Sequence, residues 1–169
     1  MLRSARAVDA EMDVQLSSHE DLALLRRGVE KWNIFRREHA DSIVLIYAHL
    51  NGAHLANVDL HCVLLVESDL QRANLSCAIL ERAILRKSDF RESNLRCAIL
   101  DGADLCRADF SGADLRDASL VSTFLKCTDL TAADLSTARG LTTAQVNEAY
   151  GDGRTKLPAD VARPARWNR

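Results

Sequence analysis

The stretch that decides the fold is GADLCRADFSGADLRDASL, residues 102–120. Leu or Phe stands at every fifth position, a small residue stands two positions earlier, and Asp usually lies between them. A period of five fits neither the 3.6-residue turn of an α-helix nor the two-residue repeat of a β-strand. The pattern therefore indicates a chain that changes direction once in every five residues.

The same period continues without a break from Leu50 to Leu135. All eighteen positions hold Leu except Phe90 and Phe110. If the small residue and the Leu both point inward, each five-residue segment forms one short side of a coil. We expect Asp and Asn to occupy the corners, because they tolerate turns and bond to nearby backbone groups. Coils stacked in this way cover one another's apolar layers, which predicts a solenoid.

A second period of twenty residues supports this interpretation. The segments NLSCAILERAIL, residues 74–85, and NLRCAILDGADL, residues 94–105, align without a gap. Four sides of five residues make one coil of twenty, so residues twenty apart are predicted to stack on the same face. The repeated CAIL is then a product of the winding and no motif in itself.

These segments resemble the A(D/N)LXX pattern of the pentapeptide-repeat family over residues 48–137. The resemblance implies an all-β solenoid, namely a right-handed quadrilateral β-helix with four pentapeptides per coil. Eighteen segments would give about 4.5 coils, with an N-terminal α-helical cap and a short C-terminal helix plus tail. We divide the chain into a disordered N-terminus (1–16), a helical cap and lead-in (17–47), the β-helix (48–137), and a C-terminal helix and capping tail (138–169).

The N-terminal cap is predicted from residues 17–39. Ser18 and Asp21 can form a capping box at the start of a helix. An apolar stripe at helical spacing follows, made of Leu22, Leu25, Val29, Trp32 and Phe35. This segment resembles the helix that precedes the repeats in bacterial family members. A lid on the first coil is the simpler interpretation, and a separate binding helix is the alternative.

The C-terminal segment departs from the period at Gly140. Thr142 and Gln145 are predicted to cap a short helix that continues to about Tyr150. Three apolar side chains beyond it would fasten the tail over the last coil or into a partner: Leu157, Val161 and Trp167.

Composition narrows the class of protein. The 169 residues fit one domain, and a formal net charge of −2 gives no general attraction to nucleic acid or anionic membrane. No apolar run is long enough to span a bilayer, and the N-terminus lacks the apolar stretch of a signal peptide. The five cysteines include no CxxC pair, which is typical of reduced thiols, so we expect a cytoplasmic location.

The sequence offers little sign of catalysis or metal binding. It contains no phosphate-binding loop and no nucleophile elbow, and its Asp residues follow the repeat rather than forming two unlike environments. We therefore expect no enzyme activity and no cofactor. The cluster of His49, His54, His61 and Cys62 lies on diverging faces, so we expect no metal site there. Cys77 and Cys97 should stack about 4.8 Å apart as free thiols.

The candidate interaction residues break the rule that the slot before Leu is polar. Five residues do so: Leu64, Ile79, Ile84, Ile99 and Phe124. Counted four to a coil, Ile79 and Ile99 lie on one face and the other three on the next. Two interpretations stay open, an interaction surface or a tolerated substitution without function.

The function predicted is that of a non-catalytic bacterial pentapeptide-repeat protein, acting as a protein–protein interaction rod or scaffold. Its partner is another protein or a second copy of the chain. The alternative, implied by the resemblance, is a DNA-mimicking modulator of DNA gyrase or topoisomerase that gives resistance to topoisomerase poisons. Residues 48–137 hold 13 acidic against 9 basic residues, a weak excess for such a mimic. We expect no direct nucleic acid binding, no membrane contact and no small-molecule substrate.

Overall fold

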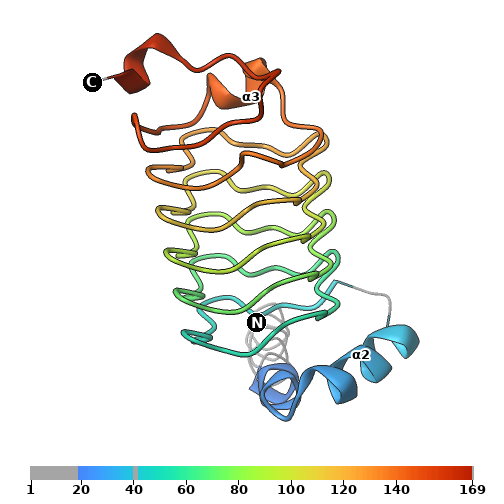
Figure 1. Ribbon diagram of the computed structural model, residues 1–169. Coiled ribbons are helices and arrows are strands. Elements are labelled where there is room, and N and C mark those ends of the chain that lie inside the picture. The colour runs from blue at the N-terminus through green and yellow to red at the C-terminus, as the bar shows by residue number, and fades with distance from the viewer. Residues whose placement is uncertain (1–18, 40–41, 169) are drawn as a thin grey trace, which may run out of the picture.

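The computed structural model describes residues 19–39 and 42–168, and it shows a stack of coils with helical segments at both ends (Figure 1). Parallel bridges join residues twenty apart, from Val44 with Leu64 up to Ser119 with Arg139. Each coil has four sides of five residues. We number the sides 1 to 4 by the inward-facing Leu of the first coil, which is Leu45, Leu50, Leu55 and Leu60 in turn.

The Asp or Asn slot lies on the side of the coil and not at its corner, which corrects the prediction. Asp89 has its backbone paired to the coil below: its N–H donates to Ser68 O (2.9 Å) and its carbonyl accepts from Leu70 N (2.8 Å). The turn comes at the two residues after the Leu or Phe. The Asp89 carboxylate still serves that turn, because its Oδ1 accepts the N–H of Arg91 at 3.0 Å.

Every corner from residue 47 to residue 132 has its second turn residue in the left-handed region. Only three of these eighteen residues are glycines, and the others have φ between 54° and 62°. A left-handed non-glycine residue costs roughly 1–2 kcal/mol, because its Cβ approaches the next carbonyl oxygen. Stacking offsets this cost through hydrogen bonds such as Cys77 N to Arg96 O (2.8 Å). A coil of this kind is therefore stable only within the stack.

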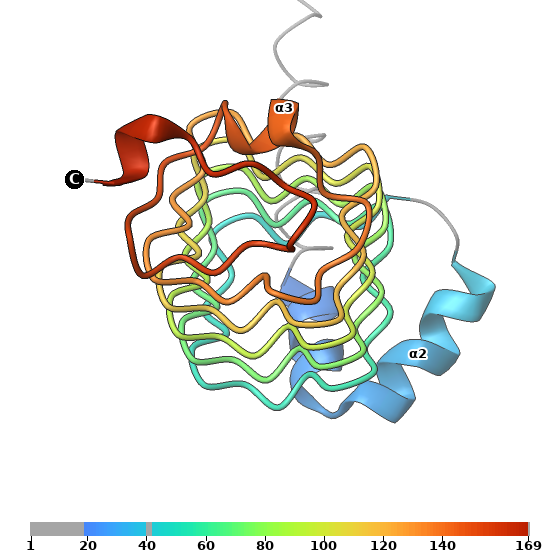
Figure 2. The same cartoon turned by 45° about the horizontal axis from the view of Figure 1, so that its top comes forward.

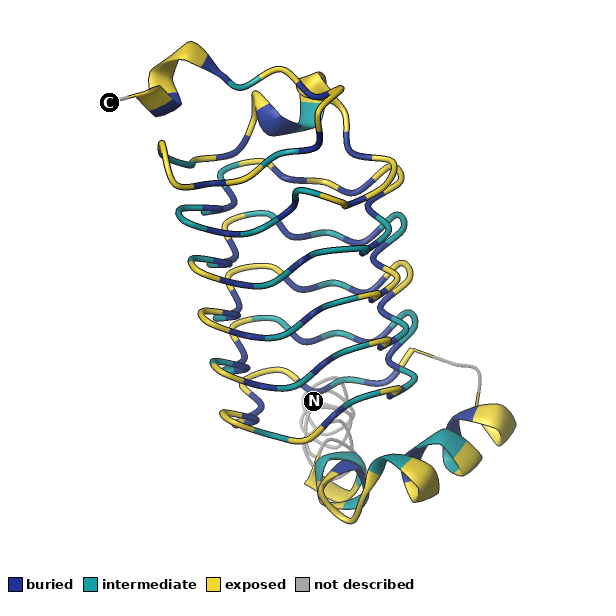
Figure 3. Ribbon diagram, viewed as in Figure 1, coloured by how far each residue is buried: buried dark blue, intermediate teal, exposed yellow. Residues whose placement is uncertain are grey.

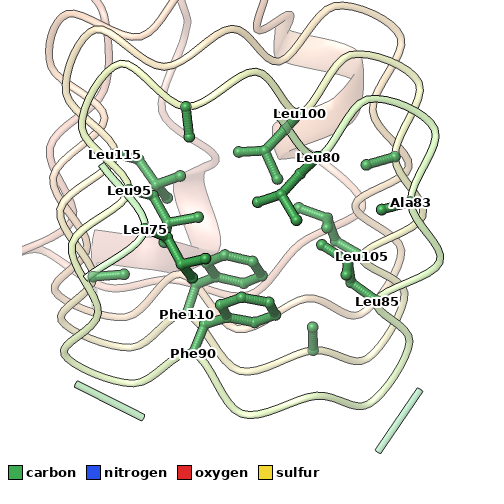
Figure 4. Packing of buried hydrophobic residues seen from close by; sticks show 14 of the residues in the cluster. Leu75, Leu80, Ala83, Leu85, Phe90, Leu95, Leu100, Leu105, Phe110 and Leu115 are labelled. Atoms are coloured by element: carbon green, nitrogen blue, oxygen red, sulfur yellow. The ribbon is translucent and has the colours of Figure 1, made fainter. Parts of the chain in front are cut away.

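The core is a set of columns that continue from coil to coil. Leu75, Leu95 and Leu115 lie one above another in Figure 4, and Phe90 stacks on Phe110 with ring centroids 4.6 Å apart. Along each coil, buried residues alternate with partly or fully exposed ones (Figure 3). Where the small inward residue is polar, it bonds to the coil below, as Thr128 Oγ1 does to Leu105 O at 2.8 Å.

The N-terminal helical region is broken in two at Gly28, whereas the apolar stripe predicted one helix. Residues 19–26 are helical, and α2 comprises Val29–Glu38. Gly28 has φ of 124°, a conformation that side chains rarely adopt, so the chain changes direction there. The predicted capping residue Ser18 and the predicted disordered segment 1–16 lie outside the described residues.

Side chains of α2 bond to backbone groups of the first coil. Trp32 Nε1 donates to Asp59 O (2.6 Å), and Asn33 Oδ1 accepts from Asp59 N (2.9 Å). Arg36 donates to His61 O at 2.7 Å. In the second coil, Ile79 lies at the position equivalent to Asp59, and its N–H donates to a carbonyl of the first coil. The side chains of α2 therefore take the place of a missing coil.

At the other end, α3 comprises Thr143–Val146, and the predicted capping box between Thr142 and Gln145 is confirmed. The helix ends at Val146, short of the predicted Tyr150, because Tyr150 pairs with Asp129 in the ladder.

The tail then crosses over the coils (Figure 2) and ends in the 3₁₀ helix η1, Ala165–Asn168. Val161 and Trp167 are buried against this end, as predicted. The Trp167 ring packs on Gly151, where an added Cβ would lie 2.8 Å from it.

Candidate interaction surface

The five predicted residues occupy outward positions on sides 1 and 4. On side 4, Ile79 is bridged directly to Ile99, which is 39% exposed. On side 1, Leu64 is bridged to Ile84, and Phe124 lies near the C-terminal end with 60% of its surface exposed. The ladder register thus brings Ile79 together with Ile99 and Leu64 together with Ile84.

The structure does not join all five residues into one patch. Asp104 is bridged between Ile84 and Phe124, and its carboxylate accepts from Arg86 Nε at 2.6 Å. The turn that separates side 4 from side 1 carries the exposed pair Glu81 and Arg82. A partner that contacts both ladders must therefore bend around a charged corner.

The apolar patch on side 1 extends beyond the predicted Leu64 and Ile84. Val44 extends the Leu64–Ile84 ladder downward, and Ile46 and Val66 stack beside it at the neighbouring turn, where Tyr47 N donates to Val66 O. We refer to these apolar residues together as the side-1 patch, which consists of Val44, Ile46, Tyr47, Leu64, Val66 and Ile84. Tyr47 is 64% exposed and Ile46 is 38% exposed. The period itself could have found this extension, because Leu45 lies five residues before Leu50, and Ile43 occupies the inward slot two residues before it.

Phe124 borders an open hollow of about 450 Å³ next to α3. Its lining consists of Ser122, Thr123, Phe124, Thr142, Ala144, Gln145 and Glu148. The hollow arises because α3 stands where the next coil would otherwise continue side 1. Gln145 Nε2 fills part of that role by donating to Leu120 O (3.1 Å) and Thr123 O (2.9 Å).

Many charged residues of the rod are paired with one another. Arg91 lowers the pKa of Asp89 through a side-chain hydrogen bond, and Arg116 lowers the pKa of Asp114 in the same way. The basic residues of the middle coils also form ion pairs between layers. These pairs are Arg72–Glu92 (2.8 Å), Lys87–Glu67 (2.6 Å), Arg86–Asp104 (2.6 Å) and Arg96–Asp117 (3.2 Å). The acidic excess is therefore partly neutralised by neighbouring coils.

The histidines of the first coil do not converge on a common point. His61 Nδ1 lies 2.6 Å from Asp59 Oδ1, while His49 and His54 are exposed on sides 2 and 3. Within residues 19–39 and 42–168, no group of three or more His, Cys, Asp or Glu side chains is arranged to hold a metal ion. None of the helices in these ranges is long and apolar enough to cross a membrane.

The chain is similar to several proteins of known structure. A pentapeptide repeat protein from the cyanobacterium Cyanothece 51142, Rfr23, is 26% identical, with 74% of this chain and 97% of that chain covered and a TM-score of 0.50. A pentapeptide repeat protein from the Arabidopsis thaliana thylakoid lumen is 22% identical, with a TM-score of 0.43. The match covers 52% of this chain and 64% of that one, which is less than two thirds of the plant protein. QnrB1, a plasmid-mediated fluoroquinolone resistance protein, is 15% identical over 73% of this chain and 85% of that chain, with a TM-score of 0.43.

No curated protein matches the chain. The family profile described as pentapeptide repeats matches in eight copies, at residues 43–76, 64–99, 73–112 and 98–136. These segments together cover more than half of the 169 residues. The structures of relatives imply that the stacked coils form a right-handed β-helix. The chain therefore belongs to the pentapeptide-repeat family.

Proposed function

We propose that this protein is a non-catalytic rod that binds another protein through the apolar ladders on sides 1 and 4. The observation that carries the proposal is the one-sided distribution of apolar residues in the outward slot. On sides 2 and 3 that slot is polar in every coil: His49, Asp69, Asp89, Asp109 and Asp129, then His54, Asn74, Asn94, Asp114 and Asp134.

The outward position makes this distribution informative. The fold needs the inward Leu and the small residue, but the side chain of the bridging residue points away from the core. An apolar side chain there adds little to the stability of the monomer. It leaves apolar surface in water, which is unfavourable by about 25 cal/mol for each Å². Contiguous apolar surface on a folded protein is typical of an interaction site. The side-1 patch and the Ile79–Ile99 pair are the contacts that we assign to the partner.

The closed ends favour lateral binding. We infer that α2 and the C-terminal tail act as caps, because both bond to backbone groups that an open solenoid would expose. An uncapped end would promote end-to-end association of rods. With both ends covered, the sides of the rod remain as its available surface.

The proposal is tested by replacing Ile79 and Ile99 with Asp. The fold should tolerate the change, since four Asp residues already stack in the same slot on side 2. We expect loss of the native complex in affinity capture and size-exclusion chromatography, because two carboxylates would have to be buried at the interface. The matched control is Asn74→Asp with Asn94→Asp, which adds the same charges in the same coils on side 3. Equal capture by both double variants would refute the assignment of side 4.

The side-1 patch is tested separately by Leu64→Asp and Ile84→Asp. Loss of capture in this variant alone would place the partner on side 1, and loss in both double variants would indicate a partner that wraps the corner. Retained capture in both variants would refute the proposed function as a whole.

A modulator of DNA gyrase is the alternative, and the column of Asp69, Asp89, Asp109 and Asp129 on side 2 is the feature that favours it. The ion pairs of the middle coils weaken it, since a mimic of DNA needs uncompensated negative charge. A supercoiling assay with purified gyrase, with and without a quinolone, decides the matter. Absence of any effect at micromolar protein would rule the alternative out.

A further inference from the structure

Two cysteines share one column at the turn between sides 3 and 4. The second turn residue in successive coils is Asn57, Cys77, Cys97, Asp117 and Thr137. Cys77 and Cys97 are held in register by the Asn74–Asn94 bridge on one side and the Ile79–Ile99 bridge on the other. Both are free and exposed, with nearly equal φ of 56° and 58°. Two thiols therefore project side by side from the same backbone conformation in adjacent coils.

The spacing of this pair suits a bridging ion better than a disulfide. Adjacent layers of a parallel ladder lie about 4.8 Å apart, and parallel side chains keep that separation at Cβ. A disulfide requires Cβ atoms about 3.8 Å apart and directed toward each other. Zinc–thiolate bonds are about 2.3 Å long, and two bonds of that length in a line would span about 4.6 Å, close to the layer spacing.

The surroundings of Cys97 oppose ionisation of its thiol in the free protein. Partial desolvation raises the pKa of the Cys97 thiol, and the neighbouring Cys77 and Asp117 raise it further, while Arg96 opposes them. Protonated thiols are poor nucleophiles and oxidise slowly. A soft metal ion can still displace the protons, because its affinity for sulfur drives deprotonation.

We propose that Cys77 and Cys97 form a two-thiolate site for a soft monovalent metal ion such as Cu(I). Binding forms two sulfur–metal bonds and releases two protons to solvent, with no change in oxidation state. The resulting complex carries one negative charge, which the nearby Arg96 guanidinium partly compensates. Thiolate ligands select Cu(I) over hard cations such as Mg²⁺ and Ca²⁺. The site lies on a turn and does not depend on the proposed protein interaction.

The experiment titrates the reduced full-length chain with Cu(I) under anaerobic conditions, against the chromogenic chelator bathocuproine disulfonate. We expect one ion bound per chain at this site. Iodoacetamide labelling with peptide mapping should show Cys77 and Cys97 protected by the ion, whereas Cys62, Cys106 and Cys127 remain reactive. Cys77→Ser should weaken binding by at least about 100-fold, since even the loss of an outer-shell group costs 10–100-fold.

Two further variants separate the stacking geometry from a general thiol effect. Cys127→Ser removes a cysteine outside the column and should leave the affinity unchanged. Cys77→Ser combined with Asp117→Cys moves the pair one coil upward in the same column and should restore binding. Undiminished Cu(I) affinity in Cys77→Ser would overturn the proposal. So would failure of the relocated pair to bind in a variant whose circular dichroism is unchanged.

Discussion

The flanking segments bond to the two ends of the rod by different means. At the N-terminal end, side chains of α2 supply hydrogen bonds to the first coil from outside the ladder, through Trp32, Asn33 and Arg36. At the C-terminal end, the chain itself continues the ladder past α3. The bridge separation there grows from twenty residues to 21 for Asp129–Tyr150 and 22 for Asp134–Lys156.

The difference shows two solutions to the same problem of unpaired backbone groups. A separate helix must match donors and acceptors one by one, so its contribution depends on a few side chains. A continued coil keeps backbone pairing but must absorb extra residues, and it needs Trp167 to cover its last layer. We therefore expect the N-terminal closure to fail through hydrogen bonds and the C-terminal closure to fail through packing.

The largest expected effect comes from the two tryptophans, one at each end. Trp32→Ala should cost about 3–5 kcal/mol of unfolding free energy, since it removes a fully buried ring. It also leaves Asp59 O without its indole donor. Trp167→Ala should cost less, because the buried Trp167 Nε1 has no hydrogen-bond partner within residues 19–39 and 42–168. Urea denaturation followed by circular dichroism measures both, and a greater loss in Trp167→Ala would contradict the comparison.

An intermediate effect is expected from a pair of amides that play matching roles. Asn33 bonds to Asn57 O and Asp59 N, both at 2.9 Å, while Gln145 bonds to two carbonyls of the fourth and fifth coils. Each replacement by Ala should cost about 1–3 kcal/mol. Gln145→Ala should cost the more, because Gln145 also completes the capping box of α3. Thermal unfolding ranks the two variants beside Asn51→Ala, which is the exposed-amide control. Equal midpoints would show that the capping box adds nothing.

The smallest effect is a difference in pH dependence between the ends. Desolvation raises the pKa of Asp134, but hydrogen bonds from Ser136 and Lys156 outweigh it and lower the pKa to about 2. Its stabilising contribution is complete above the unfolded value near 3.9 and is lost as the pH falls toward 2. Asp21 behaves oppositely, since burial and Glu20 raise its pKa in the folded state. Its protonation as the pH falls therefore stabilises the N-terminal end.

The two tryptophans allow each end to be observed alone. Trp32→Phe leaves Trp167 as the reporter of the C-terminal end, and Trp167→Phe leaves Trp32 as the reporter of the other. As the pH is lowered from about 5 to 2, emission from Trp167 should change before emission from Trp32. Lys156→Met should shift the Trp167 transition to higher pH. Simultaneous transitions at both ends would refute the assignment.

The period of five predicted the inward positions because burial repeats strictly with the coil. It also predicted the stacking of Ile79 on Ile99, since a twenty-residue register leaves no freedom. The Asp slot was wrongly predicted to lie at the corner of the coil. An Asp that precedes the turn and accepts a hydrogen bond from a turn N–H has the same sequence pattern as an Asp within the turn.

Other features depend on interactions that a periodic pattern does not encode. The apolar stripe continues across Gly28 at helical spacing, since Leu25 and Val29 are four residues apart, so the break was hidden. The lengthened register at Tyr150 and Lys156 follows from how α3 packs on Leu120 and Thr123. The extension of the side-1 patch to Val44, Ile46 and Tyr47 was not predicted, because the first coil was expected to begin at residue 48.

The fixed register also makes the length of the rod quantised. Duplication of residues 75–94 would insert one whole coil, lengthen the rod by about 4.8 Å, and leave every column of side chains in place. An insertion of five residues would instead rotate everything beyond it by a quarter turn, so that the Ile99 position no longer lies above Ile79. The number of whole coils thus sets the length of a pentapeptide-repeat rod, and the number of single repeats sets the direction in which its outward side chains point.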